Sequence, residues 1–284
     1  MTVTFDGKTA MVTGGGSGIG KALCLELARR KAKVLVTDID EAAARAVAEG
    51  LGNGSRAVRL DVRDAAAFQG AMDEFADENG GLDLLFNNAG IAIGGELHEL
   101  TLAHWDRIID INLRGVVHGV AAAYPRMVRQ ERGHIVNVAS LAGLGPAPLL
   151  VPYAATKHAV VGLSMSLRIE AAALGIRVSA LCPAAIETPI LESDNPADLP
   201  GTTWRPNMRR FLTRLGGPPY PVDKMATEAL DAVADNVAVI VLPGAARMAW
   251  RLGRMLPSLV ESLAGKAVAA ERADKVSLVK TSRS

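Results

Sequence analysis

Tyr153 and Lys157 form the clearest acid–base pair in the sequence. They are four residues apart, so on a helix both side chains lie on one face. A phenol has a pKa of about 10 and is a poor base at neutral pH, but a nearby ammonium group favours the phenolate. The pair can therefore take a proton from an alcohol or return one to a carbonyl, and we expect Lys157 to lower the pKa of Tyr153 for that purpose.

A glycine-rich turn, Gly14-Gly15-Gly16-Ser17-Gly18-Ile19-Gly20, follows a short apolar segment and precedes a predicted helix. Glycines permit the tight turn and let a pyrophosphate approach the backbone, whose N–H groups bind phosphate oxygens at the helix start. We predict that a dinucleotide binds at Gly14, Ser17, Gly18, Ile19 and Gly20. A Walker motif requires Ser or Thr after its lysine, and Ala22 follows Lys21, which disfavours nucleoside triphosphate hydrolysis.

Asp38 ends the next apolar segment, about 20 residues beyond the glycine-rich turn. A carboxylate at this position accepts hydrogen bonds from the adenosine ribose hydroxyls and repels a 2′-phosphate. Ile39 follows Asp38 and Ser17 stands inside the turn, so neither position offers a basic residue to that phosphate. The sequence therefore predicts NAD(H) rather than NADP(H) as the cofactor.

Four separated motifs, taken in order, resemble the short-chain dehydrogenase/reductase family. They are the glycine-rich turn after Thr13, Asn87-Asn88-Ala89-Gly90, Ser140 with Tyr153-x-x-x-Lys157, and Pro183 to Thr188. The likeness covers Lys8 to about Pro189 and extends weakly as far as the last predicted strand. It implies an NAD-dependent oxidoreductase of ordinary length that acts by hydride transfer and carries a C-terminal extension.

The resemblance also assigns roles to particular residues. It implies that Tyr153 is the acid/base, that Lys157 also binds the nicotinamide ribose, that Ser140 holds the substrate oxygen, and that Asn112 anchors a water of the proton relay. Further cofactor contacts are implied at Asp61 and Val62 for the adenine, at Asn88, Ala89 and Gly90 for the ribose, and at Pro183, Ile186 and Thr188 for the nicotinamide. Ala184 stands where the family usually has glycine, and its methyl group either narrows the nicotinamide pocket or is tolerated there.

Parallel strands must position these motifs, because short β-branched segments alternate with longer segments of helical period. Continuous apolar character, typical of strands buried on both faces, marks Lys8 to Thr13, Lys33 to Asp38, Arg56 to Asp61, Leu82 to Asn87, His134 to Ser140, Ile176 to Cys182 and Val237 to Leu242. Helices are predicted over Ile19 to Arg30, Ala65 to Glu78, Leu102 to Gln130, Tyr153 to Ala173 and Pro221 to Asn236. The pattern predicts an α/β fold of the doubly wound (Rossmann) class, a seven-stranded parallel sheet with helices on both faces in a single domain.

Composition excludes several classes of protein. Of 284 residues, 49% are hydrophobic and 21% are charged, which suits a globular core and argues against disorder. Lysine plus arginine (31) nearly balance aspartate plus glutamate (30), which argues against a nucleic-acid partner. The two cysteines have no metal-ligand spacing, so no metal is predicted, and they suit a reducing compartment. With no apolar signal region near residue 1 and no apolar span, we expect a cytoplasmic protein.

Two segments fall outside the alternating pattern. Residues 190–220, rich in proline, glycine and arginine, are expected to form a substrate lid. We therefore divide the chain into a dinucleotide-binding catalytic domain over residues 1–243 and an extension over residues 244–284. The extension is basic and amphipathic. It covers the substrate cleft, packs on a neighbouring subunit or rests on an anionic membrane surface, with packing as the default.

Uncharged segments border the expected position of the reacting carbon. Leu141 to Pro152 contains no charged residue, and Ile91-Ala92-Ile93 is apolar. Such walls favour a small apolar secondary alcohol or its ketone over a sugar or a dicarboxylate. The lid also holds four arginines that are equally suited to gripping an anionic group or to lying in solvent, namely Arg205, Arg209, Arg210 and Arg214.

Assembly and two rival functions remain open at this point. The resemblance implies a homodimer or homotetramer that pairs the helices beginning near Leu102 and Tyr153. One rival function is a 3-oxoacyl-[acyl-carrier-protein] reductase, which needs a protein partner and normally favours NADPH, so Asp38 counts against it. The other is a non-catalytic cofactor-binding protein, against which the intact Ser140, Tyr153 and Lys157 set counts.

Overall fold

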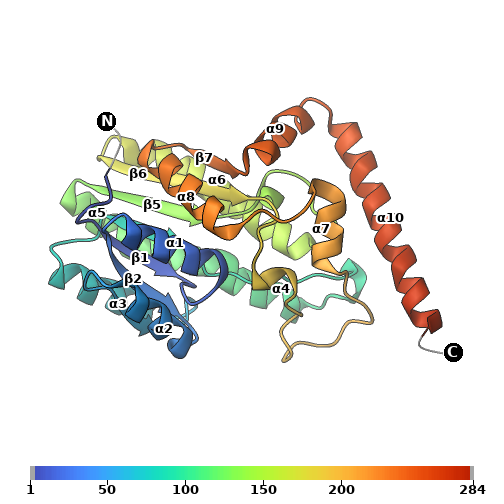
Figure 1. The fold of residues 1–284 in the computed structure, drawn as a ribbon, viewed down its shortest axis with the longest axis horizontal. Coiled ribbons are helices and arrows are strands. Elements are labelled where there is room, and N and C mark those ends of the chain that lie inside the picture. The colour runs from blue at the N-terminus through green and yellow to red at the C-terminus, as the bar shows by residue number, and fades with distance from the viewer. Residues whose placement is uncertain (1–3, 282–284) are drawn as a thin grey trace.

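A seven-stranded parallel sheet runs through the centre of the protein, as the computed structural model shows for residues 4–281, with side chains described as far as Asp274 (Figure 1). In chain order the strands are β1 (Thr9–Thr13), β2 (Lys33–Asp38), β3 (Arg56–Arg59), β4 (Leu84–Asn87), β5 (Gly133–Val138), β6 (Ile176–Pro183) and β7 (Val239–Leu242). Across the sheet they follow the order β3-β2-β1-β4-β5-β6-β7. The order reverses between β1 and β4, and the crevice at the carboxyl ends of such strands is where doubly wound sheets bind ligands.

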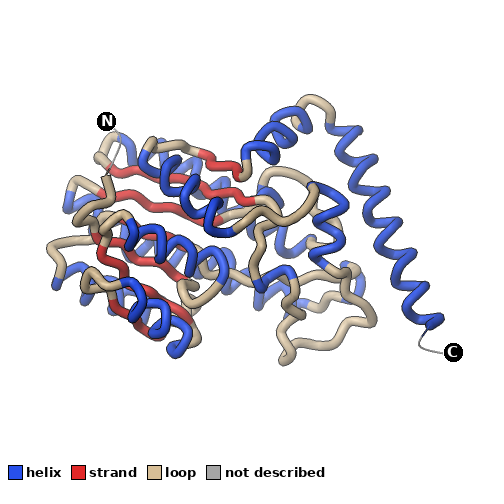
Figure 2. The backbone as a smooth tube through the Cα atoms, in the orientation of Figure 1, coloured by secondary structure: helices blue, strands red, loops and turns tan. Residues whose placement is uncertain are grey.

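Helices cover both faces of the sheet, as Figure 2 shows with helices in blue around the red strands. They are α1 (Gly18–Arg29), α2 (Glu41–Leu51), α3 (Ala65–Glu78), α4 (Leu102–Ile109), α5 (Gly115–Gln130), α6 (Val151–Ala172), α7 (Met208–Gly216), α8 (Val222–Ala234), α9 (Gly244–Gly253) and α10 (Pro257–Thr281). One buried apolar cluster joins α1, α2 and α8 to one face, and a second joins α3, α5 and α6 to the other. The predicted doubly wound, single-domain fold is confirmed.

Helix α2 was not among the predicted helices. It begins at an effective cap, because the Asp40 carboxylate accepts a hydrogen bond from the Ala43 N–H. Its buried face consists of Ala44, Val47, Ala48 and Leu51, spaced as on one side of a helix. Two of these four side chains are alanines, so the apolar stripe is too weak to stand out in the sequence.

The prediction of one long helix over Leu102 to Gln130 is correct in extent, because residues 102–130 are helical without a break, but the helix is not a regular α-helix throughout. A five-residue π-helical segment, Asp110–Arg114, separates α4 from α5. The wider turn carries Asn112, whose fully buried amide bonds to the backbone of Ile91 in another segment. Such π-helical turns are frequent at functional sites, and this one contacts the segment that follows β4.

Several element ends differ from the predicted ones by two residues. Strand β5 ends at Val138, so Ser140 lies beyond the strand, and helix α6 begins at Val151 with Pro152 in its first turn. Proline at this position is compatible with helix because the first N–H groups have no partner within the helix. Among the described helices, none combines the length and apolar character needed to cross a lipid bilayer.

Candidate active site

The glycine-rich turn joins β1 to α1 in a conformation that requires glycine. Gly14 has φ of +63°, and a Cβ there would lie 2.9 Å from the Ala89 Cα. A Cβ on Gly20 would lie 2.0 Å from the Gly14 carbonyl oxygen. The turn is therefore tightly closed at the start of α1, and Ser17 at its tip is exposed. This geometry fits a pyrophosphate held by backbone N–H groups.

Asp38 lies against this turn at the end of β2. Its carboxylate accepts hydrogen bonds from the Gly16 N–H at 2.9 Å and from the Asp40 N–H at 3.1 Å. The two bonds fix a negative charge beside the turn. A ribose diol can share such a carboxylate, whereas a 2′-phosphate would be repelled by it. The residues present thus fit NAD(H).

The remaining predicted cofactor residues reach the same edge of the sheet. Asp61 follows β3 and forms an ion pair with Arg63 at 2.6 Å, whose hydrogen bonds lower the pKa of the Asp61 carboxyl. Val62 beside it is buried, and its carbonyl bonds to His118 Nδ1. The Asn88 amide donates to the Thr13 carbonyl at 2.9 Å. These contacts join the segment after β4 to the end of β1 and hold the segment after β3 against α5.

Thr13 positions neighbouring backbone groups, a role that we did not predict from the sequence. Its hydroxyl accepts hydrogen bonds from the N–H groups of Asn88 at 3.0 Å and Ala89 at 3.1 Å. It therefore fixes the turn that ends in Gly90 against the glycine-rich turn. Its place as the last residue of an apolar strand, directly before the glycines, is the signal that could have revealed it.

The segment after β6 closes the crevice from the other side. Pro183 is the last residue of β6, and Ile186 and Thr188 are both buried. A Cβ on Gly18 would lie 3.5 Å from Thr188. The Pro183 to Thr188 motif therefore lies against the start of α1. Ala184 within this motif is partly exposed.

Tyr153, Lys157 and Ser140 come together at the carboxyl end of β5. Lys157 is buried on α6, and its Nζ donates to the Val138 carbonyl at 2.8 Å and lies 5.6 Å from the centre of the Tyr153 ring. Ser140 lies close enough to Tyr153 to lower the pKa of its phenol. The Ser140 hydroxyl accepts from the Ala142 N–H at 3.1 Å, which orients it beyond the strand end.

Asn112 lies next to this group. Its Oδ1 accepts from the Ile91 N–H and its Nδ2 donates to the Ile91 carbonyl, both at 2.9 Å. A Cβ on Gly90 would lie 3.2 Å from Asn112 Oδ1 and 3.6 Å from Lys157 Nζ. Asn112 and Lys157 thus flank one backbone position, and the sequence-predicted residues form one cluster.

Burial dominates the electrostatics of the cluster. It raises the pKa of the Tyr153 phenol, although the interaction with Ser140 acts in the opposite direction. The shift is opposite to the one we predicted, because burial of the phenol outweighs the interactions that favour the phenolate. Burial also lowers the pKa of Lys157 to about 8. Cys182 beneath them is a buried thiol whose pKa burial raises to about 12.

Apolar side chains from the lid and from the extension cover Tyr153. Leu149, Leu150, Met208, Phe211 and Ala267 form a buried cluster, against which Tyr153, Trp204 and Val268 pack. Met208 and Phe211 belong to α7, whereas Ala267 and Val268 belong to α10. Helix α10 therefore lies on the lid helix, and Figure 1 shows the two side by side.

Ion pairs fasten α10 to the lid. Glu271 is fully buried and accepts hydrogen bonds from the Asn207 N–H at 2.9 Å and from Arg210 and Arg214. Arg272 forms an ion pair at 2.7 Å with Glu96, which lies between β4 and α4. The other two lid arginines also have partners in the chain: Arg209 bonds to Glu187 and Glu192, and Arg205 bonds to Ser193 and Asp194. Because all four arginines are engaged in this way, a role in gripping an anionic substrate is disfavoured.

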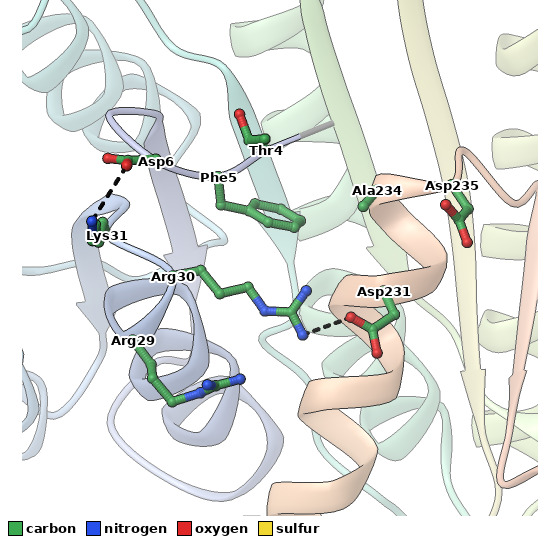
Figure 3. A pocket seen from close by; sticks show the side chains of 9 residues that line it. All are labelled: Thr4, Phe5, Asp6, Arg29, Arg30, Lys31, Asp231, Ala234 and Asp235. Atoms are coloured by element: carbon green, nitrogen blue, oxygen red, sulfur yellow. Dashed lines mark ion pairs between the residues drawn. The ribbon is translucent and has the colours of Figure 1, made fainter. Parts of the chain in front are cut away.

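A surface depression lies at the other end of the sheet, as Figure 3 shows. Thr4, Phe5, Lys31 and Asp235 line it, and these residues precede the amino ends of β1, β2 and β7. An ion pair between Arg30 and Asp231 at 2.8 Å bridges it. Ligands of doubly wound sheets bind at the carboxyl ends, so this depression is separate from the cluster around Tyr153.

Comparison with known proteins agrees with this geometry. Residues 8–199 match the family model described as short chain dehydrogenase. A 3-alpha-(or 20-beta)-hydroxysteroid dehydrogenase of Mycobacterium tuberculosis is 37% identical over 217 residues, which are 76% of this chain and 79% of that protein.

The chain belongs to the short-chain dehydrogenase family.

Two solved structures of the family are similar over most of the chain. A short chain dehydrogenase/reductase from Burkholderia phymatum, in complex with NAD, has a TM-score of 0.82 and 33% identity, covering 90% of this chain and 96% of that one. A 3-ketoacyl-(acyl-carrier-protein) reductase from Brucella melitensis, complexed with NADH, has a TM-score of 0.75 and 32% identity, covering 84% and 98%. Membership of the family, together with the placement of Asp38, makes this chain an NAD-dependent oxidoreductase, and the predicted family and cofactor are confirmed.

Proposed function

We propose that the enzyme interconverts an apolar secondary alcohol and its ketone. The observation that carries this proposal is the position of Tyr153, which lies beside Lys157 and packs against the apolar cluster of Leu149, Leu150, Met208 and Phe211. A substrate whose hydroxyl meets Tyr153 would have its carbon skeleton among these apolar side chains. Burial of such a skeleton stabilises binding by about 25 cal/mol for each Å² removed from water.

In this proposal each residue of the cluster has one task. The Tyr153 phenolate takes the proton of the substrate hydroxyl, and Ser140 holds the substrate oxygen by a hydrogen bond. Lys157, fixed by the Val138 carbonyl, places a positive charge that stabilises the phenolate. Asn112, fixed by Ile91, supports a water in the proton relay. NAD supplies the hydride acceptor when bound.

The cofactor contacts are proposed at the residues that surround the crevice. Asp38 binds the adenosine ribose, and Lys157 binds the nicotinamide ribose. The other contacts are Gly14, Ser17, Gly18, Ile19, Gly20, Asp61, Val62, Asn88, Ala89, Gly90, Tyr153, Pro183, Ile186 and Thr188. Bonds among these segments, such as those of Thr13 to Asn88 and Ala89, support this assignment.

Two further proposals concern the setting of the enzyme. Helices α4, α5 and α6 carry exposed apolar side chains, among them Leu102 (79%), Val117 (41%) and Ile169 (78%), which suit a homodimer or homotetramer interface. The mass of the protein in solution tests this. We also place the enzyme in the cytoplasm, where Cys24 and Cys182 would stay reduced, as both are unpaired thiols here.

A 3-oxoacyl-[acyl-carrier-protein] reductase is the second candidate. The similar Brucella melitensis reductase is complexed with NADH, so an NAD-type site is compatible with that activity. Asp38 therefore does not count against this candidate. The two candidates differ in the substrate, because a carrier-protein reductase acts on a thioester presented by a protein.

A substrate panel distinguishes the candidates. The panel contains hydroxysteroids, polyols and 3-oxoacyl thioesters, and the thioesters are tested both on carrier protein and as small analogues. Alcohols are assayed by the formation of NADH and ketones by its consumption, both followed by absorbance. We expect turnover of the hydroxysteroids and none of the polyols. Turnover confined to polyols would exclude an apolar site, and turnover confined to carrier-protein thioesters would favour the second candidate.

A further inference from the structure

The corner between α9 and α10, residues 244–263, exposes a row of large apolar side chains. Each is more than half exposed; they are Met248, Leu252, Met255, Leu256, Leu259 and Leu263. No residue of α9 is buried. Figure 1 shows the turn between α9 and α10 at the outline of the molecule. A set of this size at a protein surface marks an interaction site rather than chance exposure.

The rest of the structure holds this corner in place. On α9, Ala246 and Trp250 pack against the buried cluster that contains Ala139 and Cys182. Beyond the corner, the buried Glu271 fastens α10 to the lid. The corner is thus anchored on both sides, and its apolar row points outward as a result of packing elsewhere on the two helices.

Basic residues predominate around the row, and Glu261 near its end is the one acidic residue among residues 244–263. Arg247, Arg251 and Arg254 are exposed, and the segment from Gly244 to Val260 contains no acidic residue. Within the part of the chain whose side chains are described, none of the three arginines forms an ion pair, and Arg254 stacks over Trp250 at 5.7 Å. An apolar row flanked by unpaired cations is complementary to a surface that is apolar inside and anionic outside.

A second copy of this chain fits the corner less well. If two copies paired their apolar rows about a two-fold axis, each would bring its own three arginines to the same interface. Glu261, inside the row, is the single acidic residue that each copy offers there, so most of these cations would face each other. Like charges placed together at an interface disfavour the pairing.

We propose that the α9–α10 corner docks the enzyme on the surface of a membrane that contains anionic lipids. The apolar row would lie among the upper acyl chains, and the three arginines would lie at the level of the lipid phosphates. The helices lie in the interface and do not span the bilayer. Helix α10 connects the corner to the lid. If the substrate is an apolar alcohol, as proposed above, it would enter the site from the membrane beside the corner.

Vesicle flotation tests the docking. Purified full-length enzyme is mixed with vesicles of phosphatidylcholine alone or of phosphatidylcholine with phosphatidylglycerol, at low and high salt. We expect it to float with the anionic vesicles, and to do so less at high salt because salt screens the arginines. Each Arg→Gln change at positions 247, 251 and 254 should weaken binding about fivefold, since one basic residue contributes about 1 kcal/mol.

The apolar row is tested separately with a matched control. The double variant Leu252→Glu/Leu256→Glu places charges on the row, and we expect it to lose flotation. Leu25→Glu, on α1 and of similar exposure (46%), should float like the unchanged enzyme. Thermal unfolding and NADH binding show that both variants are folded.

Three results would overturn the proposal. The first is absence of flotation by the unchanged enzyme, and the second is equal flotation by the double variant. The third is that the unchanged enzyme does not float and the double variant has a smaller mass in solution than the unchanged enzyme. That result would show that the row binds a second copy of the chain. Flotation does not depend on turnover, so a failure of the proposed alcohol substrate would leave these outcomes readable.

Discussion

Replacement of the buried Lys157 by Met should inactivate the enzyme and stabilise its fold at pH 7. Burial lowers the pKa of Lys157 from 10.5 to about 8, so the folded protein holds this proton 2.5 pH units less tightly than the unfolded chain. At about 1.36 kcal/mol per pH unit, the ammonium costs the fold about 3 kcal/mol below pH 8. Loss of the hydrogen bond to the Val138 carbonyl costs the variant about 1 kcal/mol, which leaves a net gain of about 2 kcal/mol.

The gain should depend on pH with a definite sign. Below pH 8 both the folded and the unfolded states carry the proton, so the difference between the two proteins is constant. Between about pH 8 and 10.5 the unfolded chain binds more protons, so the stability of the unchanged enzyme rises with pH. The advantage of Lys157→Met should therefore shrink over this interval.

Denaturant unfolding of both proteins at a series of pH values measures this difference. Other titrating groups are shared by the two proteins and cancel in the comparison. Lys224→Met, at an exposed position on α8, serves as the control and should show neither the gain nor its pH dependence. If Lys157→Met were less stable than the unchanged enzyme at pH 7 and the difference did not change above pH 8, the reasoning from burial would be refuted.

Four other substitutions test the packing and the site. Gly119→Ala should destabilise the fold by about 1–3 kcal/mol, because the added Cβ would lie 2.0 Å from Asn87 Oδ1. Gly162→Ala, with open space around it in α6, should instead stabilise the fold by about 0.5–1 kcal/mol. Thermal unfolding of the two variants measures the difference. Asp38→Ala should weaken NADH binding about tenfold and improve NADPH binding, as followed by cofactor fluorescence, and unchanged NADH affinity would contradict the role of the carboxylate. Glu271→Gln should raise the KM for the alcohol while leaving NADH affinity unchanged, because it loosens the lid from α10; an equal loss of both would indicate a general folding defect.

The sequence was informative where one local pattern determines structure. Mostly apolar segments located the strands, since both faces of a parallel sheet are buried, although β3 at the edge of the sheet begins and ends in arginine and is only partly buried. The glycine-rich turn and Asp38 were placed together because they follow neighbouring strands β1 and β2, which pair in register. Tyr153 and Lys157 were predicted on one helix face, and α6 carries both.

Features that depend on contacts between distant segments were not predictable in this way. The π-helical turn at Asn112 is accompanied by bonds to Ile91, 21 residues earlier, which no local pattern records. The partners of the lid arginines lie partly on α10, as far away as Glu271, about which the spacing of Arg210 and Arg214 says nothing. The direction of the Tyr153 pKa shift follows from burial, which the four-residue spacing to Lys157 does not reveal.

The central claim is that Tyr153 transfers the proton in an NAD-dependent reaction at this site. Its most direct test is to measure NADH affinity and alcohol turnover in the unchanged enzyme and in Tyr153→Phe, which removes one hydroxyl group. We predict that the two proteins bind NADH with similar affinity and that turnover by the variant falls by a factor of about 10²–10⁴, the usual contribution of a general acid–base group. Near-normal turnover by Tyr153→Phe would contradict the account.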